Sequence, residues 1–427
     1  MNERPVARRS NRVPIPTCDE RRSFKSSSPS CEIAGAHPVR RAARPPNSGH
    51  SIAAAFPKAA WQSFAFVDNP RALGRRLHHT LQPMNAKRKL IIDQDAHGPA
   101  STNLQSILML LQAPDVEVLG ICVVSGDGWC DENLAHTLRL LEIAGRTDVP
   151  VFRGATFPVL NSRRRMQQWE GLHGQLFWKG AWTERLYDGT PRPGAHPEQP
   201  RLVPPLPEGM PSTEPAQGTA AEFLARSVRE HAGEVSIWAA GPLTNLALAA
   251  RLEPDFAQLA GELFFMGGSF NPVAGDSHFA QEYRHNPRQE FNLRWDPEAA
   301  SLVLKEPWRR ITQVPVDATT RTLWSAELQG AAASADTPWA SYLGRFGRRL
   351  PMWDEVAAAV WLDPTLATRR ETMAVDVDTA FTANYGGVLS WPVGRGPGLG
   401  EQAVDVVLDV DVARVERLVL HLLCGAA

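Results

Sequence analysis

The stretch that decides the fold is Lys89-Leu90-Ile91-Ile92-Asp93-Gln94-Asp95-Ala96-His97-Gly98-Pro99-Ala100-Ser101-Thr102-Asn103. A short apolar run ends in two carboxylates, Asp93 and Asp95, and a Gly-Pro loop follows them. Beyond the loop, apolar residues recur at helical spacing, at Leu104, Ile107 and Leu111. The stretch therefore predicts a strand, a loop and a helix, with two acids where the strand ends.

The two acids point to a functional site. Side chains at the carboxyl end of a parallel strand line the crevice in which open α/β sheets bind ligands. Because alternate residues of a strand share one face, we expect Asp93 and Asp95 to point the same way. Two like charges raise each other's pKa unless a cation or a set of donors compensates them. The pair therefore favours metal binding or catalysis over two solvated loop aspartates.

Composition limits the class of protein. The chain has 427 residues, of which 43% are hydrophobic and 21% are charged, as in soluble globular proteins. The formal net charge is −1, so nothing global indicates a nucleic-acid or membrane partner. Five unpatterned cysteines indicate reduced thiols rather than a disulfide framework, which predicts a cytoplasmic protein.

The chain divides into two parts. Residues 1–86 are rich in Arg, Ser and Pro and have no sustained hydrophobic period, so we predict a disordered basic extension. Strand and helix patterns alternate over residues 87–427, which predicts one α/β domain with a mostly parallel sheet and flanking helices. Within it we predict a long irregular segment from Gly154 to Thr213 and a strand from Ile311 to Val316 that ends at Asp317.

Polar motifs recur at the predicted strand ends and helix starts. They are Asp93-x-Asp95, Asp127, Gly241-Pro242-Leu243-Thr244-Asn245, Met266-Gly267-Gly268, Glu290-Phe291-Asn292 and Asp354 before an apolar helix. In combination and order, these motifs resemble the inosine-uridine-preferring nucleoside hydrolase family over roughly residues 88–420. The resemblance implies a modified doubly wound α/β fold and hydrolysis of the N-glycosidic bond of ribonucleosides by water.

The resemblance also implies a calcium site and a catalytic base. Asp95 would be a Ca²⁺ ligand and the general base, with Asn103, Asp354 and the carbonyl of Ala240 as further ligands. His173 would protonate or contact the leaving base, and His97 is a second candidate for that role. The residues that would bind or support substrate are Asp93, Thr102, Asp127, Met266, Glu290, Asn292 and Trp353. Oxygen-only ligation suits Ca²⁺. The implied partner is a small ribonucleoside, and we expect a homo-oligomer.

The sequence departs from the family pattern at the first loop. Two acids of the usual Asp-x-Asp-Pro-Gly-x-Asp-Asp motif are replaced by Thr102 and Asn103, and the loop is longer. Trp353 stands where many members have a histidine before Asp354. Losing an acid should weaken Ca²⁺ binding. The alternative hypothesis is therefore a catalytically impaired relative that only binds a ribosyl ligand; a phosphotransferase with a first-strand Asp-x-Asp ranks lower. Four tryptophans could stack on a nucleobase, and they are Trp129, Trp169, Trp178 and Trp353.

Overall fold

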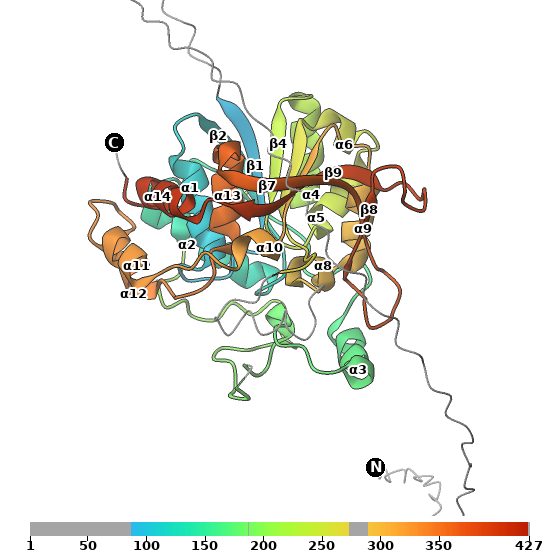
Figure 1. Ribbon diagram of the computed structural model, residues 1–427. Helices are drawn as coiled ribbons and strands as arrows, with labels where there is room; N and C mark the ends of the chain where they lie inside the picture. The colour runs from blue at the N-terminus through green and yellow to red at the C-terminus, as the bar shows by residue number, and fades with distance from the viewer. Residues whose placement is uncertain (1–86, 187, 273–288, 426–427) are drawn as a thin grey trace, which may run out of the picture. The chain divides into compact units, whose positions relative to one another are not determined.

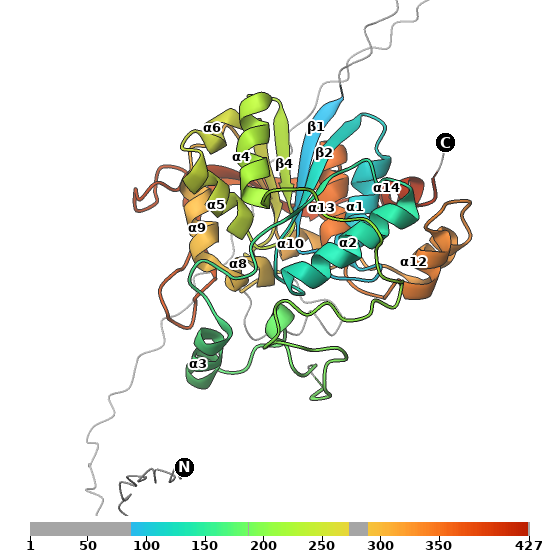
Figure 2. The same ribbon diagram turned by 180° about the vertical axis from the view of Figure 1, so that it is seen from behind.

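The computed structural model describes residues 87–186, 188–272 and 289–425, so the predicted N-terminal extension lies outside the described residues. The described residues form a nine-stranded sheet with helices on both faces (Figures 1 and 2). The strand order is β3-β2-β1-β4-β5-β6-β9-β7-β8. Neighbours from β3 to β9 run parallel, and β7 pairs antiparallel with both β9 and β8. The predicted α/β class with a mostly parallel sheet is confirmed.

The strands are β1 (Arg88–Gln94), β2 (Val116–Val123), β3 (Val151–Arg153), β4 (Val235–Ala239), β5 (Glu262–Met266), β6 (Ile311–Val314), β7 (Ala367–Val377), β8 (Val388–Pro392) and β9 (Gln402–Val410). The helices are α1 (Thr102–Gln112), α2 (Cys130–Ala144), α3 (Arg163–His173), α4 (Ala220–Glu230), α5 (Thr244–Leu252), α6 (Phe256–Leu259), α8 (Phe291–Trp295), α9 (Pro297–Lys305), α10 (Val316–Thr319), α11 (Ala326–Ala333), α12 (Ala340–Phe346), α13 (Trp353–Leu362) and α14 (Val412–Leu423). Two short 3₁₀ turns, η1 (Gly180–Trp182) and η2 (Pro364–Leu366), complete the described elements.

Alternation along β1 separates two hydrophobic cores. Leu90 and Ile92 pack into the core beneath α1, α2, α13 and α14, whereas Ile91 packs into the core beneath α4, α5 and α9. All three side chains are fully buried. A strand covered on both faces needs apolar residues at successive positions, which explains the unbroken run at the start of β1. The same alternation sends Gln94 toward α13 and Asp93 toward α5.

Two sequence predictions differ from the structure. The segment predicted to be irregular contains α3 and η1. The N-cap of α3 is Ser162, whose side chain accepts a hydrogen bond from the backbone N–H of Arg165. Only one face of α3 is buried, and basic residues occupy several of the other positions. The apolar periodicity that indicates a helix is therefore weak in the sequence. β6 ends at Val314, and Asp317 lies in α10, where its carboxylate accepts backbone N–H groups of Phe270 and Asn271.

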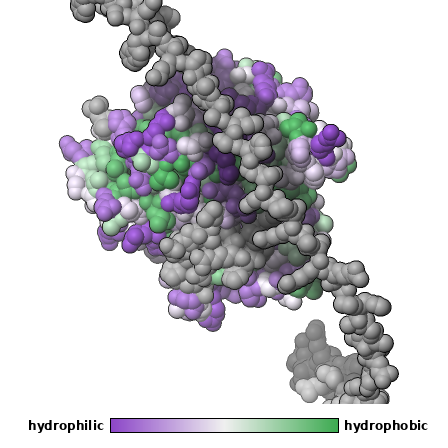
Figure 3. Space-filling model, viewed as in Figure 1, coloured by the Kyte–Doolittle hydropathy of each residue, from purple (hydrophilic) through white to green (hydrophobic). Residues whose placement is uncertain are grey.

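The carboxyl ends of β1, β2, β4 and β5 face one side of the domain. In Figures 1 and 2, α8 and α10 lie at these ends, and the green segment with α3 lies beyond them. On the described surface in Figure 3, hydrophilic and hydrophobic residues are interspersed. Among the described residues, no helix combines the length and the apolar character needed to cross a membrane.

The Asp296 carboxylate links three segments of the chain through hydrogen bonds. Its carboxylate caps α9 through the N–H of Ala299 at 3.1 Å, as its position before Pro297 predicts. It also accepts Thr244 Oγ1 at the start of α5 at 2.7 Å and the N–H of Val159 at 2.8 Å. The side chain is fully buried, and burial raises its pKa to about 6.

We predict that Asp296→Ala lowers the free energy of unfolding by about 2–4 kcal/mol, because it leaves buried donors without an acceptor as well as removing a cap. Asp411→Ala is the matched control, since Asp411 caps α14 through the N–H of Arg414 alone. The control should cost about 1 kcal/mol. Denaturant unfolding measures both values, and equal losses would contradict the tying role of Asp296.

Candidate active site

A cavity of about 680 Å³ lies at the carboxyl ends of the parallel strands. Its wall includes most residues proposed from the sequence for metal or substrate binding: Thr102, Asn103, Asp127, Ala240, Met266, Glu290, Asn292, Trp353 and Asp354. These residues come from six separate segments of the chain. The strand topology therefore brings together the motifs that the sequence places far apart.

Asp95 lies directly after β1, pressed between two glycine-containing loops. A Cβ on Gly126 would come 2.0 Å from Asp95 Oδ2, and one on Gly241 would come 2.8 Å from the Asp95 backbone nitrogen. Both loops follow neighbouring strands, β2 and β4. Only residues without a side chain permit this approach, so Gly126 and Gly241 fix the position of the Asp95 carboxylate.

Two further carboxylates, those of Asp127 and Asp354, lie near Asp95. Asp127 donates its backbone N–H to Asp95 Oδ2 at 2.7 Å, and Asn103 donates its side-chain amide to Asp95 Oδ1 at 3.1 Å. Burial raises the pKa of Asp95 well above its usual range, and the Asp127 and Asp354 carboxylates raise it further. Burial likewise raises the pKa of Asp354 and of Asp127. The cluster therefore favours bound protons or a bound cation.

Gln94 bridges two of these acids and was not identified from the sequence. Its Oε1 accepts the Asp95 backbone N–H at 2.9 Å, and its Nε2 donates to Asp354 Oδ2 at 3.1 Å. The two-residue alternation of β1 is the signal that could have found it, because Gln94 shares the α13-facing side of Leu90 and Ile92.

Thr102 joins the first loop to α13. Its Oγ1 accepts the backbone N–H of Asp354 at 3.0 Å and donates to a carboxylate oxygen of Glu355. Glu355 is 1% exposed, and burial raises its pKa to about 7. Thr102 thus positions the start of α13, although the enlarged loop separates it from the Asp-x-Asp motif.

Glu290 and Asn292 form a cap beside the cavity. Glu290 accepts backbone N–H groups of Gly268 at 2.8 Å, Asn292 at 2.8 Å and Leu293 at 3.2 Å, so it is also the N-cap of α8. Asn292 Nδ2 donates to the carbonyl of Met266 at 3.2 Å. The arrangement holds one carboxylate and one amide rigidly at the cavity wall.

Three residues proposed for the site do not line the cavity, and they are Asp95, Asp93 and His173. Asp93 is fully buried, and its Oδ2 accepts Asn245 Nδ2 at 2.8 Å on the α5 side of the sheet. β1 ends at Gln94, so the alternation that should have aligned Asp93 with Asp95 no longer applies to Asp95. His173 lies at the exposed end of α3, with its ring 5.1 Å from that of Trp169.

Aromatic side chains form one part of the wall. Trp129, Trp178 and Trp353 line the cavity, whereas Trp169 packs in a buried cluster behind it. Trp178 Nε1 donates to Asp127 Oδ1 at 2.6 Å, and the Arg192 guanidinium lies 4.8 Å from the centre of the Trp178 ring. Arg192 also lines the cavity and was not identified from the sequence.

Two sets of side chains in the described part of the chain could hold a metal. The first is the oxygen set of Asp95, Asp127 and Asp354, which is buried and acidic, although among the described residues its oxygens do not all lie within 4.8 Å of one another. The second is His97, Glu132 and His136, whose potential ligand atoms all lie within 4.8 Å of one another. The two sets differ in donor chemistry and share the cavity wall.

Comparisons with known proteins identify the family of the chain. Residues 90–417 match the sequence pattern of the family described as inosine-uridine preferring nucleoside hydrolase. The chain is 30% identical over 257 residues to probable uridine nucleosidase 2 of Arabidopsis thaliana, covering 60% of this chain and 68% of that protein. It is 34% identical over 233 residues to uridine nucleosidase 1 of the same plant, covering 55% and 57%.

A solved structure of a plant nucleoside hydrolase superposes with a TM-score of 0.60 at 25% identity, covering 79% of this chain and 99% of that one. The match of the family pattern extends over the whole sheet, from β1 to α14. The chain therefore belongs to the inosine-uridine preferring nucleoside hydrolase family and is a ribonucleoside hydrolase.

Proposed function

We propose that this enzyme is Ca²⁺-dependent and that Asp95 is its general base. The observation that supports the proposal is the burial of the Asp95 carboxylate within electrostatic reach of the Asp127 and Asp354 carboxylates, both of which line the cavity. Burial of so much like charge is costly unless a cation compensates it. The predicted homo-oligomer and cytoplasmic location stay predictions from the sequence.

The donor set fits calcium. Asp95, Asp354 and the Ala240 carbonyl offer only oxygen, which Ca²⁺ prefers. Asn103 is the exception, because its amide nitrogen faces Asp95 while its Oδ1 accepts Ser101 Oγ at 3.0 Å. Turning the amide over would give the cation an oxygen, and the Ser101 hydroxyl could then accept from the amide nitrogen. When bound, Ca²⁺ would orient the ribose hydroxyls and the attacking water.

The protein groups have distinct roles in the proposed reaction. Asp95 takes a proton from the attacking water, and the buried carboxylates stabilise the positive charge that develops on the sugar. Glu290 and Asn292 orient the ribose, and Met266 packs beneath it. Trp353 and Trp129 offer flat faces on which a nucleobase can stack. Names of relatives suggest uridine or inosine as first substrates to test.

We predict that Asp95→Asn lowers kcat by roughly 10²–10⁴-fold, since it removes the base. Base release from a panel of ribonucleosides, with Ca²⁺ and with a chelator, measures the effect. Asp148→Asn is the control, because Asp148 is an exposed partner of Arg146 and should keep full activity. Chelator-resistant turnover, or an active Asp95→Asn variant, would contradict the proposed mechanism.

We predict that Asp354→Asn raises the melting temperature in chelator at pH 8 but not at pH 4. The folded-state pKa of Asp354 lies above the unfolded value, so its contribution is favourable at low pH and is lost as pH rises through that range. Asp148→Asn is again the control: Arg146 lowers the pKa of Asp148, so this substitution should give no gain at pH 8. A larger gain at pH 4 would show that Asp354 is not destabilised by its charge.

We predict that Asn103→Asp tightens Ca²⁺ binding and raises base release, because ligand charge tunes calcium affinity. The enlarged loop does not remove position 103 from the site, since Asn103 Nδ2 lies 3.1 Å from Asp95 Oδ1. Gln168→Glu adds the same charge on the exposed face of α3 and should change neither quantity. Calorimetric titration with Ca²⁺ measures the affinity of the variant and of the unchanged protein. Equal affinities would favour the alternative of an impaired, ribosyl-binding relative.

A further inference from the structure

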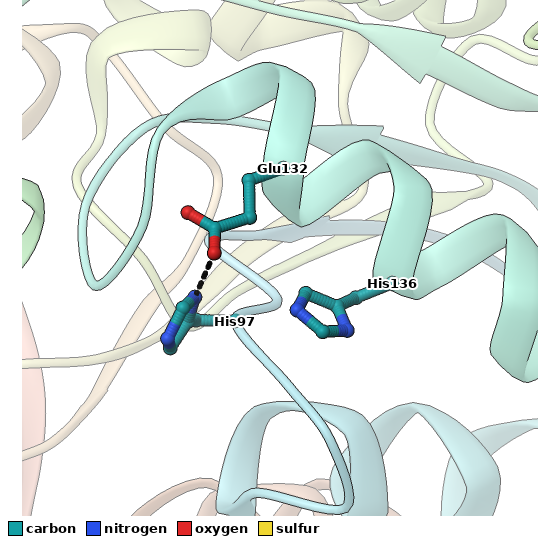
Figure 4. Close-up of side chains that lie close together, drawn as sticks. All are labelled: His97, Glu132 and His136. Carbon is teal, nitrogen blue, oxygen red and sulfur yellow. Dashed lines mark ion pairs between the residues drawn. The ribbon is translucent and has the colours of Figure 1, made fainter. Parts of the chain in front are cut away.

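A histidine-rich cluster lies in the cavity wall apart from the acidic set of Asp95, Asp127 and Asp354. His97 comes from the first loop, and Glu132 and His136 come from α2 (Figure 4). Spacing of four residues places Glu132 and His136 on one face of the helix. His97 Nδ1 lies 4.0 Å from Glu132 Oε1, and one ring nitrogen of His136 points toward His97 in Figure 4.

A fourth residue faces the same carboxylate. His196 Nε2 lies 3.4 Å from Glu132 Oε2, has no hydrogen-bond partner in the structure and belongs to a side chain that is 8% exposed. Its other ring nitrogen, Nδ1, lies 2.7 Å from the Gly194 carbonyl, which can only accept. Nδ1 therefore has a hydrogen, and Nε2 is the ring nitrogen that faces Glu132.

A partner outside the cluster orients the His136 ring in a similar way. His136 Nδ1 contacts a carboxylate oxygen of the buried Glu208, which leaves Nε2 for the cluster. Histidines that bind metals usually donate their second N–H to a carboxylate or a carbonyl.

We propose that His97, Glu132 and His136, with His196 as a fourth donor, form a second metal site for a divalent transition-metal ion of the zinc class. Imidazole and carboxylate donors suit zinc, whereas the oxygen set at Asp95 suits calcium. Tetrahedral zinc at about 2.0–2.1 Å needs ligand atoms about 3.4 Å apart. The spacing of His196 and Glu132 already meets this, and His97 would have to approach Glu132 by roughly half an ångström.

The positive charge of Arg192 opposes metal binding. Arg192 donates to His97 Nε2 at 3.1 Å, so His97 must change tautomer and Arg192 must turn from it before Nδ1 can bind a cation. Arg192 has other acceptors, the carbonyls of Gly180 and Asp127. Glu132 and Glu208 supply the balancing negative charge. All four proposed ligands line the cavity, so the bound metal would present any open position to the cavity contents.

The test is titration of the purified full chain with Zn²⁺, with Co²⁺ as a spectroscopic probe. We expect one zinc bound in the Asp95→Asn variant, in which the calcium set is disabled. Glu132→Gln and His136→Gln should each weaken that binding by more than roughly 100-fold, and Glu208→Gln by roughly 10–100-fold. Co²⁺ should give the visible absorption bands of a four-coordinate site.

His421→Gln, on the exposed face of α14, is the matched control and should bind zinc normally. Melting curves without metal verify that every variant is folded. Absent zinc binding in folded Asp95→Asn protein, or affinity unchanged by Glu132→Gln and His136→Gln, would overturn the proposal. Neither result bears on base release with Ca²⁺, so this proposal can fail while the proposed function stands.

Discussion

The structure depends on the position of one carboxylate, Asp95, at the point where the loops after β1, β2 and β4 meet. Gly126 and Gly241 leave room for it and for nothing larger. Asp127 and Asp354 then bring further negative charge to the same buried point. Such a cluster is unstable on its own, and stored unfavourable charge of this kind is characteristic of sites that bind a cation or move a proton.

The sheet makes this arrangement possible. Strands β1, β2, β4 and β5 are parallel neighbours, so their carboxyl ends meet at one edge of the sheet. Covering helices on both faces bury the carboxyl-end halves of these strands. Two amides donate to the acids: Gln94 donates to Asp354 and Asn103 to Asp95. Asp127 and Asp354 line the cavity, and Asp95 lies buried next to them.

Local sequence patterns predicted the strands and helices better than the contacts within the site. The run before Asp93 and the Asp-Pro pair at Asp296 specified β1 and the start of α9, because alternation and capping act within a few residues. Partners far apart in sequence, such as Gln94 and Asp354, are set by packing of α13 on the sheet and leave no local signal. The cluster of His97 with α2 was missed for the same reason, although the four-residue spacing in α2 was visible.

The most direct test of the account is a crystal structure of the protein grown with Ca²⁺, with anomalous diffraction recorded at long wavelength. The account predicts one strong calcium peak about 2.3–2.6 Å from oxygens of Asp95, Asp354 and the Ala240 carbonyl, with the Asn103 amide turned over. A peak elsewhere, or none while Asn103 still donates to Asp95, would contradict it.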